Sequence, residues 1–323
     1  MKRPVLAVGK RLAAAALTLV AVSMVLFAGA SMVPGDAASA SLGISTTPEQ
    51  IDALRAEWGL DRPLPVRYAE WMGAVLRGDL GTSLISHRPV IDVIAEPLWS
   101  TTVLVLIASA VTVPLAVLLG VLTGLRPGGR LDRFVSGVSL TVVAIPSFVV
   151  AGLLVMVFSV TLGLLPAVSL PPLGGTPLDR PEILVLPAGS LVLFATAWAS
   201  RLVRATVVDA NLAPNAEAAR LAGVPERTVV WRHVLPTRGA AAVRALAPLF
   251  AWLVSALFGG TTVVEVVFNY PGLSTVLLTA VRNHDAAVLE GVGLLLAVVI
   301  VGSLIVADLL GFLANPKLRT GTP

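Results

Sequence analysis

Six long apolar segments constrain the fold of this chain more than any other feature. They cover roughly residues 12–33, 97–125, 134–163, 183–203, 243–264 and 287–310. A helix crosses a bilayer with about 20 mainly apolar residues, and in lipid its backbone must satisfy its own hydrogen bonds. Only 13% of the residues are charged, whereas about a quarter is usual in soluble domains. We therefore expect an all-α membrane protein with six transmembrane helices.

The first apolar segment allows two interpretations. Basic residues precede it, and Ala28-Gly29-Ala30 resembles a signal-peptidase site, so a cleaved signal peptide is one of them. Its apolar core of about 19 residues exceeds the 7–15 typical of signal peptides. This length favours a retained membrane helix.

The distribution of lysine and arginine predicts the orientation. With both termini in the cytoplasm, the inner segments hold 16 of the 23 basic residues. The segment 33–98 then lies outside, with nine acidic against five basic residues. The excess of positive charge inside favours this topology and places the polar segment 205–240 in the cytoplasm. The outer segment contains two short predicted helices and is too small for an independent enzyme domain.

Several kinds of chemistry are excluded by residue types. The chain has no cysteine, and its three histidines are far apart in sequence, which argues against thiolate chemistry and a histidine metal cluster. It also lacks the glycine-rich phosphate loop that ends in Lys-Ser or Lys-Thr. We expect no catalytic residue, metal or cofactor in this chain, so that any nucleotide is bound by a partner.

Prolines and acids interrupt the apolar segments. Pro114, Pro146 and Pro248 each free a backbone carbonyl, and they fit hinges and passive irregularities equally well. Glu265, Glu290 and Asp308 lie close to segment ends, where structural pairing or contact with water is the favoured role.

A compact charged stretch, EAARLAGVPERTVVWRHVLP, begins at Glu217 between the fourth and fifth segments. Pro214 and Pro225 suit the first turns of two short helices, and Gly223 suits a turn between them. Residue types alone leave three interpretations: a loop on the membrane surface, a DNA-binding helix-turn-helix, or a docking element for a cytoplasmic partner.

The spacing of this stretch resembles the EAA loop of ABC importer permeases, although His233 stands where isoleucine is frequent. Other stretches resemble the dipeptide and oligopeptide permeases of the DppB/OppB type, in the same order along the chain. These are TPEQIDALRAEWGLDRPLPVRYAEWM with RGDLGTSL, Ala144 to Phe148, VVEVVFNYPGLSTVLLTAVRNHD, and the final Asn315-Pro316-Lys317, where Asp-Pro-Arg is commoner.

The resemblance implies the transmembrane domain of a type I ABC importer with a small helical extracytoplasmic segment. It divides the chain into a first helix with the outer segment (1–98), a five-helix permease core with the EAA loop at 205–240 (99–312), and a cytoplasmic tail (313–323). The residues implied to couple to an ATPase are Glu217, Ala218, Ala219, Gly223, Leu235 and Pro236. Possible pathway or hinge residues are Pro146, Glu265, Pro271 and Gly272.

The implied partners are a second homologous permease subunit, two cytoplasmic ABC ATPase subunits, an extracytoplasmic substrate-binding protein and the bilayer of a bacterial inner membrane. The implied cargo is a dipeptide or oligopeptide, with nickel or a glycoside as alternatives. An ATP-independent secondary transporter is the rival from another class. A nucleic-acid-binding regulator is disfavoured because both ends of the charged stretch run back into apolar segments.

Overall fold

The computed structural model describes residues 2–32, 48–59, 61–230 and 239–314. Apart from one bridge between Thr82 and Pro89, the regular elements in these ranges are helices. They are α1 (Lys2–Met32), α3 (Pro48–Glu57), α4 (Leu64–Val75), α5 (Val90–Leu125), α6 (Arg130–Ala144), α7 (Ser147–Leu154), η1 (Val155–Thr161), η2 (Pro177–Asp179), α8 (Glu182–Asn211), α9 (Pro214–Leu221), α10 (Glu226–Thr228), α11 (Gly239–Val267), α12 (Leu273–Arg282) and α13 (Ala286–Ala314).

Four helices are long and apolar enough to cross a membrane: α1, α5, α8 and α13. The bent pair of α6 with α7 and η1 makes a fifth if it is counted as one span. In α11, the apolar stretch whose side chains are described is Ala251–Val267, which is shorter than a span. The all-helical membrane fold is therefore confirmed, and within the described residues four or five spans meet the length and composition of a membrane helix.

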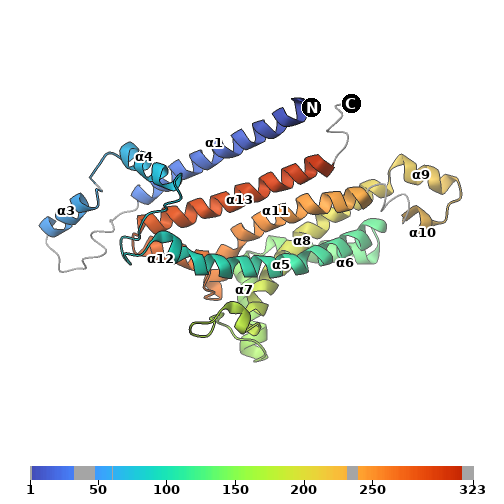
Figure 1. The fold of residues 1–323 in the computed structure, drawn as a ribbon. Helices are drawn as coiled ribbons and strands as arrows, with labels where there is room; N and C mark the ends of the chain where they lie inside the picture. Colours follow the sequence, from blue (N-terminus) through green and yellow to red (C-terminus); the bar gives the residue numbers. More distant parts are fainter. Residues whose placement is uncertain (1, 33–47, 60, 231–238, 315–323) are drawn as a thin grey trace.

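The third apolar segment differs from the continuous helix that its composition suggests. The chain bends by 104° between α6 and α7. Ile145 is extended, with φ −82° and ψ 131°, and Pro146 caps α7. Proline disfavours helical geometry in the residue before it and has no N–H to continue the ladder, so α6 ends at Ala144. Helix α7 consequently turns away from the bundle (Figure 1).

Glycines bring α5 and α8 into close contact. A Cβ at Gly120 would overlap the Val203 side chain and the Ser200 carbonyl, and one at Gly124 would overlap Val207. Small residues at such positions let two helix backbones approach closely in a membrane. On the other side of the bundle, α13 packs against both α11 and α1.

The two ends of the bundle are distinct (Figure 1). The start of α1, the end of α13 and α9–α10 lie at one end, and α3, α4 and α12 lie at the other. At the second end, α4 is held to α1 by the Tyr68 ring, whose centroid is 5.5 Å from that of Phe27, and by a 2.8 Å hydrogen bond between Ser23 and Tyr68. The described part of the predicted outer segment therefore lies at the end of the bundle opposite the charged stretch, with α4 packed on α1.

Candidate functional site

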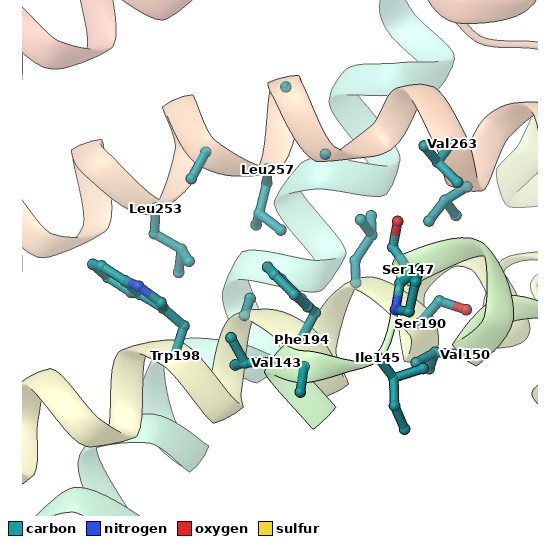
Figure 2. Close-up of a pocket in the computed structure, with 18 of the residues that line it drawn as sticks. Val143, Ile145, Ser147, Val150, Ser190, Phe194, Trp198, Leu253, Leu257 and Val263 are labelled. Carbon is teal, nitrogen blue, oxygen red and sulfur yellow. The ribbon is translucent and has the colours of Figure 1, made fainter. Parts of the chain in front are cut away.

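A cavity of about 640 Å³ opens where the α6–α7 bend meets α8 and α11. Figure 2 shows Val143, Ile145 and Ser147 from the bend, Phe194 and Trp198 from α8, and Leu253, Leu257 and Val263 from α11 around it. Pro146 also lines the cavity. The proline that breaks the third segment thus shapes one wall, because the bend leaves room between α6–α7 and the two facing helices.

The wall of this cavity is almost entirely apolar. Its polar side chains are the hydroxyls of Ser147 and Ser190 and the indoles of Trp198 and Trp252, and none of its lining residues is ionisable. The two indole rings stack, with centroids 3.9 Å apart and an interplanar angle of 17°. A surface of this kind suits contact with a solute by shape, stacking and a few hydrogen bonds, without ion pairing.

Glu265 is not among the residues that line this cavity. Its side chain is fully buried. Thr101 of α5 donates a 2.6 Å hydrogen bond to one carboxyl oxygen, and the Ser274 N–H of α12 donates a 2.8 Å bond to the other. Glu265 therefore joins the end of α11 to α5 and to the first turn of α12, where a carboxyl group suits the unpaired N–H groups.

Pro271 and Gly272 form the turn that leads into α12. Gly272 caps this helix, and the Glu265 carboxyl group occupies the space that a Cβ at Gly272 would need. The Leu273 N–H donates a 2.9 Å hydrogen bond to the Thr101 hydroxyl. These residues fasten α12 at the end of the bundle that carries α3 and α4.

Within the described residues, the charged stretch forms the predicted first helix and turn, and the three-residue α10 begins where the second helix is predicted. Helix α9 begins at Pro214, and Pro225 caps α10. Gly223 between them has φ +77°, a conformation that glycine adopts readily and that other residues rarely adopt. The stretch therefore makes a compact hairpin, hereafter the 214–230 hairpin. His233, Leu235 and Pro236 lie outside the described residues.

The predicted coupling residues divide between two faces of the 214–230 hairpin. Glu217, Ala218 and Gly223 are exposed. Ala219 is buried and packs with Ala216, so it contributes to the internal contacts of the hairpin. The exposed face also includes Leu221, which is 83% accessible.

Arg220 ties the hairpin to the end of α8. Its guanidinium donates to the Asn211 carbonyl oxygen at 2.8 Å and to the Asn211 side-chain oxygen at 2.5 Å. It also donates to both carboxylate oxygens of Glu226, at 2.9 and 3.1 Å. These bonds lower the pKa of the Glu226 carboxyl below its usual value. The hairpin is thus fixed to α8 by bonds as well as by packing.

The structure brings together further residues that the sequence analysis did not select. Arg204 of α8 forms a bidentate ion pair with Asp132 of α6. Its Nε and Nη2 atoms donate hydrogen bonds of 2.5 and 2.8 Å to the two carboxylate oxygens. A charged residue at the edge of an apolar segment signals a partner, and Asp132 lies just before the third segment. The Trp198–Trp252 stack had no comparable signal, because the two tryptophans are distant in sequence.

Among the described residues, no three histidine, aspartate or glutamate side chains gather as they would around a metal ion.

Comparisons with known proteins agree with this architecture. Residues 116–320 match the family model described as binding-protein-dependent transport system inner membrane component, and residues 5–105 match the model of its N-terminal region. A protein of Brucella abortus (strain 2308) named as a peptide transport system permease is 32% identical over 310 residues, which are 96% of this chain and 98% of that protein. The glutathione transport system permease protein GsiC of Escherichia coli (strain K12) is 31% identical over 96% of this chain and 97% of its own length. This chain therefore belongs to the family of inner membrane components of binding-protein-dependent transport systems, and it is a permease subunit of an ABC importer.

Proposed function

We propose that this chain forms one half of the membrane pathway of an ABC importer for short peptides. The cavity beside the α6–α7 bend is its share of that pathway, and a second, homologous permease subunit completes it. Two cytoplasmic ATPase subunits drive the cycle, and an extracytoplasmic binding protein delivers the cargo. The observation that carries the proposal is the match to permeases over nearly the whole chain, combined with a cavity at a break in a membrane helix.

The cargo class is supported by the relatives and by the wall of the cavity. Relatives carry names for peptide and glutathione transport, and glutathione is itself a tripeptide. A cavity of about 640 Å³ with two hydroxyls and stacked indoles accommodates the backbone and varied side chains of a short peptide. A proton-coupled secondary transporter would require an ionisable group along its pathway, which the lining residues of this cavity do not supply.

We further propose that the 214–230 hairpin docks on an ATPase subunit. Its exposed face offers Glu217, Ala218 and Gly223, and its turn lies at the same end of the bundle as the start of α1 and the end of α13 (Figure 1). In this proposal, that end of the bundle faces the cytoplasm. The chain then crosses the membrane six times, and α11 is one of the six spans. In the same proposal Glu265, Pro271 and Gly272 anchor α12 at the outer end, while Pro146 shapes the pathway.

Docking is tested by co-purification of the chain with its cognate ATPase subunits. Glu217→Arg reverses an exposed charge, and Gly223→Pro demands a negative φ where the turn has +77°. We expect both variants to lose the ATPase and ATP-driven uptake. Glu96→Arg reverses an exposed charge on α5 at the opposite end and serves as the matched control. Unchanged co-purification and uptake in both hairpin variants would contradict the docking role.

Orientation is tested by thiol labelling in whole cells, because the chain has no cysteine of its own. We expect a membrane-impermeant reagent to modify Arg88→Cys near the outer helices and to leave Ala222→Cys on the hairpin unmodified until the cells are opened. Labelling of Ala222→Cys in intact cells would reject the proposed orientation.

The pathway is tested by narrowing the cavity. Gly260 lines it and has open space at its Cβ position, so Gly260→Leu should fill part of it. We expect uptake of radiolabelled glutathione and trialanine into proteoliposomes to fall while ATPase binding persists. Gly189→Leu also enters open space but lies outside the lining of the cavity, and should leave uptake unchanged. Equal effects of the two substitutions would argue against this pathway.

A further inference from the structure

Helix α6 is attached to the bundle by very few buried side chains. Of its fifteen residues, Asp132 and Ser139 are the buried ones. Leu131, Phe134 and Leu140 remain 48%, 70% and 54% accessible. The packing of α6 along its length is therefore sparse compared with that of α5 against α8.

A second cavity, of about 300 Å³, lies between α6 and the α5–α8 pair. Phe134 and Val138 of α6 line it on one side, and Leu119 of α5 and Ser200 of α8 line it on the other. A space of this size means that the middle of α6 lacks the close contacts that hold packed helices in one position. The first turn of α6, which holds the buried Asp132, is therefore its most firmly attached part.

At that first turn, Asp132 forms an ion pair with Arg204 of α8. The guanidinium of Arg204 donates to both carboxylate oxygens, at 2.5 and 2.8 Å. Asp132 also accepts from the Gly128 N–H at 2.8 Å and from the Ser136 hydroxyl at 3.2 Å. A bidentate arginine–carboxylate contact fixes the relative orientation of the two side chains as well as their distance. It joins α6 to α8 at one defined point.

Arg204 is itself part of a rigid body that includes the 214–230 hairpin. Gly124 of α5 approaches the Arg204 carbonyl so closely that a Cβ there would lie 3.0 Å from it. Two turns further along α8, Asn211 is bound by Arg220 of the hairpin. Ala210 of α8 and Leu125 of α5 also pack with the hairpin residues Ala216 and Val229. A displacement of the hairpin must therefore displace the ends of α5 and α8 together.

We infer that the Asp132–Arg204 pair is the strut that transmits movement of the 214–230 hairpin to the bent α6–α7 span lining the cavity. The pair positions α6, and α6 carries the bend at Pro146 that forms one cavity wall. This inference rests on the proposed docking of an ATPase at the hairpin. Packed elements move as units, so a directional charged link between elements that have a cavity between them is where coupling is concentrated.

The test measures movement at the cavity without requiring a known cargo. Ser147→Cys gives a single thiol on the cavity wall of an otherwise cysteine-free chain. Its rate of modification by a methanethiosulfonate reagent is measured in the complex with the cognate ATPase subunits, before and after arrest with ATP and orthovanadate. We expect arrest to change this rate in the parent chain. In Asp132→Asn the change should shrink about tenfold, within the range usual for coupling between distant sites.

Two further variants separate coupling from folding. Arg204→Lys keeps the positive charge but loses the bidentate contact, so it should also reduce the change in labelling rate. If Asp132→Asn does not assemble with the ATPase subunits, the test is made with Arg204→Lys. Asp132→Glu keeps the carboxylate and should restore part of the change. Glu70→Gln, which breaks the exposed Arg62–Glu70 pair at the other end, is the matched control and should leave the change at the parent value.

The strut and the docking proposal fail in different ways. In the variants of the strut, ATPase co-purification and ATP hydrolysis should persist while the labelling change is lost. A parent-like labelling change in both Asp132→Asn and Arg204→Lys would overturn the strut and leave docking intact. Failure of the parent chain to retain any ATPase would instead overturn docking, and the strut with it.

Discussion

The carboxyl group of Glu265 occupies the space in which any side chain at position 272 would begin, and so Gly272 lies directly against it. The backbone of Gly272 is not in the left-handed region, since its φ is −105°. Its requirement for glycine therefore comes from space and not from backbone geometry. Through this contact and the bond from Ser274, the end of α11 and the start of α12 form one packed unit.

Gly272→Ala should lower the stability of the chain. The added methyl forces Glu265 out of its hydrogen bonds, and overpacking of this kind costs about 1–3 kcal/mol. We expect a lower apparent melting temperature, measured by tryptophan fluorescence in detergent. Gly302→Ala on α13 enters open space and should not lower it. If Glu265→Ala is combined with Gly272→Ala, the double variant should lose less than the sum of the single losses, because the overlap is gone.

Thr101→Val should destabilise the same unit by a different route. It removes the donor to Glu265 and the acceptor for the Leu273 N–H, leaving buried polar groups unpaired at about 1–3 kcal/mol each. Thr101→Ser keeps the hydroxyl and should retain most of the stability. The same thermal measurement compares the two variants. A valine variant as stable as the parent would mean that the hydroxyl does not matter at this position, and a serine variant that loses as much as the valine variant would mean that the methyl group matters as much as the hydroxyl.

Gly120→Ala should separate α5 from α8. A Cβ at Gly120 would approach Val203 and the Ser200 carbonyl at 2.6 to 2.8 Å, and the backbone carbonyl cannot turn aside as a flexible side chain can. We expect a loss of about 1–3 kcal/mol in stability and a reduced yield of folded chain in size-exclusion chromatography. Gly137→Ala on α6 meets no atom within 4 Å and should be tolerated. A Gly120→Ala chain that folds and melts like the parent would contradict this close contact.

The ion pair between Arg220 and Glu226 should weaken at acidic pH. Hydrogen bonds from Arg220 lower the pKa of Glu226 from its usual 4.5, so the pair stabilises the hairpin above that pH and is lost as pH falls through the lower folded value. A spin label at Ala222→Cys should therefore keep constant mobility between pH 8 and about pH 5 and become more mobile well below pH 4.5.

Glu226→Gln should abolish this acid-induced rise in spin-label mobility and should raise the mobility at neutral pH. Glu217→Gln, on the exposed face of the hairpin, should leave the acid-induced rise in place. If the rise persists in Glu226→Gln, it is caused by the titration of another group.

Much of the local structure could be predicted from residue types alone. Uninterrupted apolar length predicts helices α1, α5, α8 and α13, because a backbone in lipid has to satisfy its own hydrogen bonds. Pro214 and Gly223 predict the start of α9 and its turn, because proline and glycine restrict or permit particular backbone angles whatever surrounds them. The family resemblance, carried by short motifs in order, was likewise available from the chain itself.

Only the tertiary structure decided which distant residues meet. Asp132 and Arg204 are 72 positions apart, and Thr101 and Glu265 are 164 apart, so neither pairing has a local spacing to reveal it. Pro146 indicates an irregularity in the third apolar segment. The 104° bend and the cavity beside it, however, depend on how α8 and α11 pack against the α6–α7 bend. Backbone preference acts within a few residues, whereas close packing and the pairing of buried polar groups are settled by the whole fold.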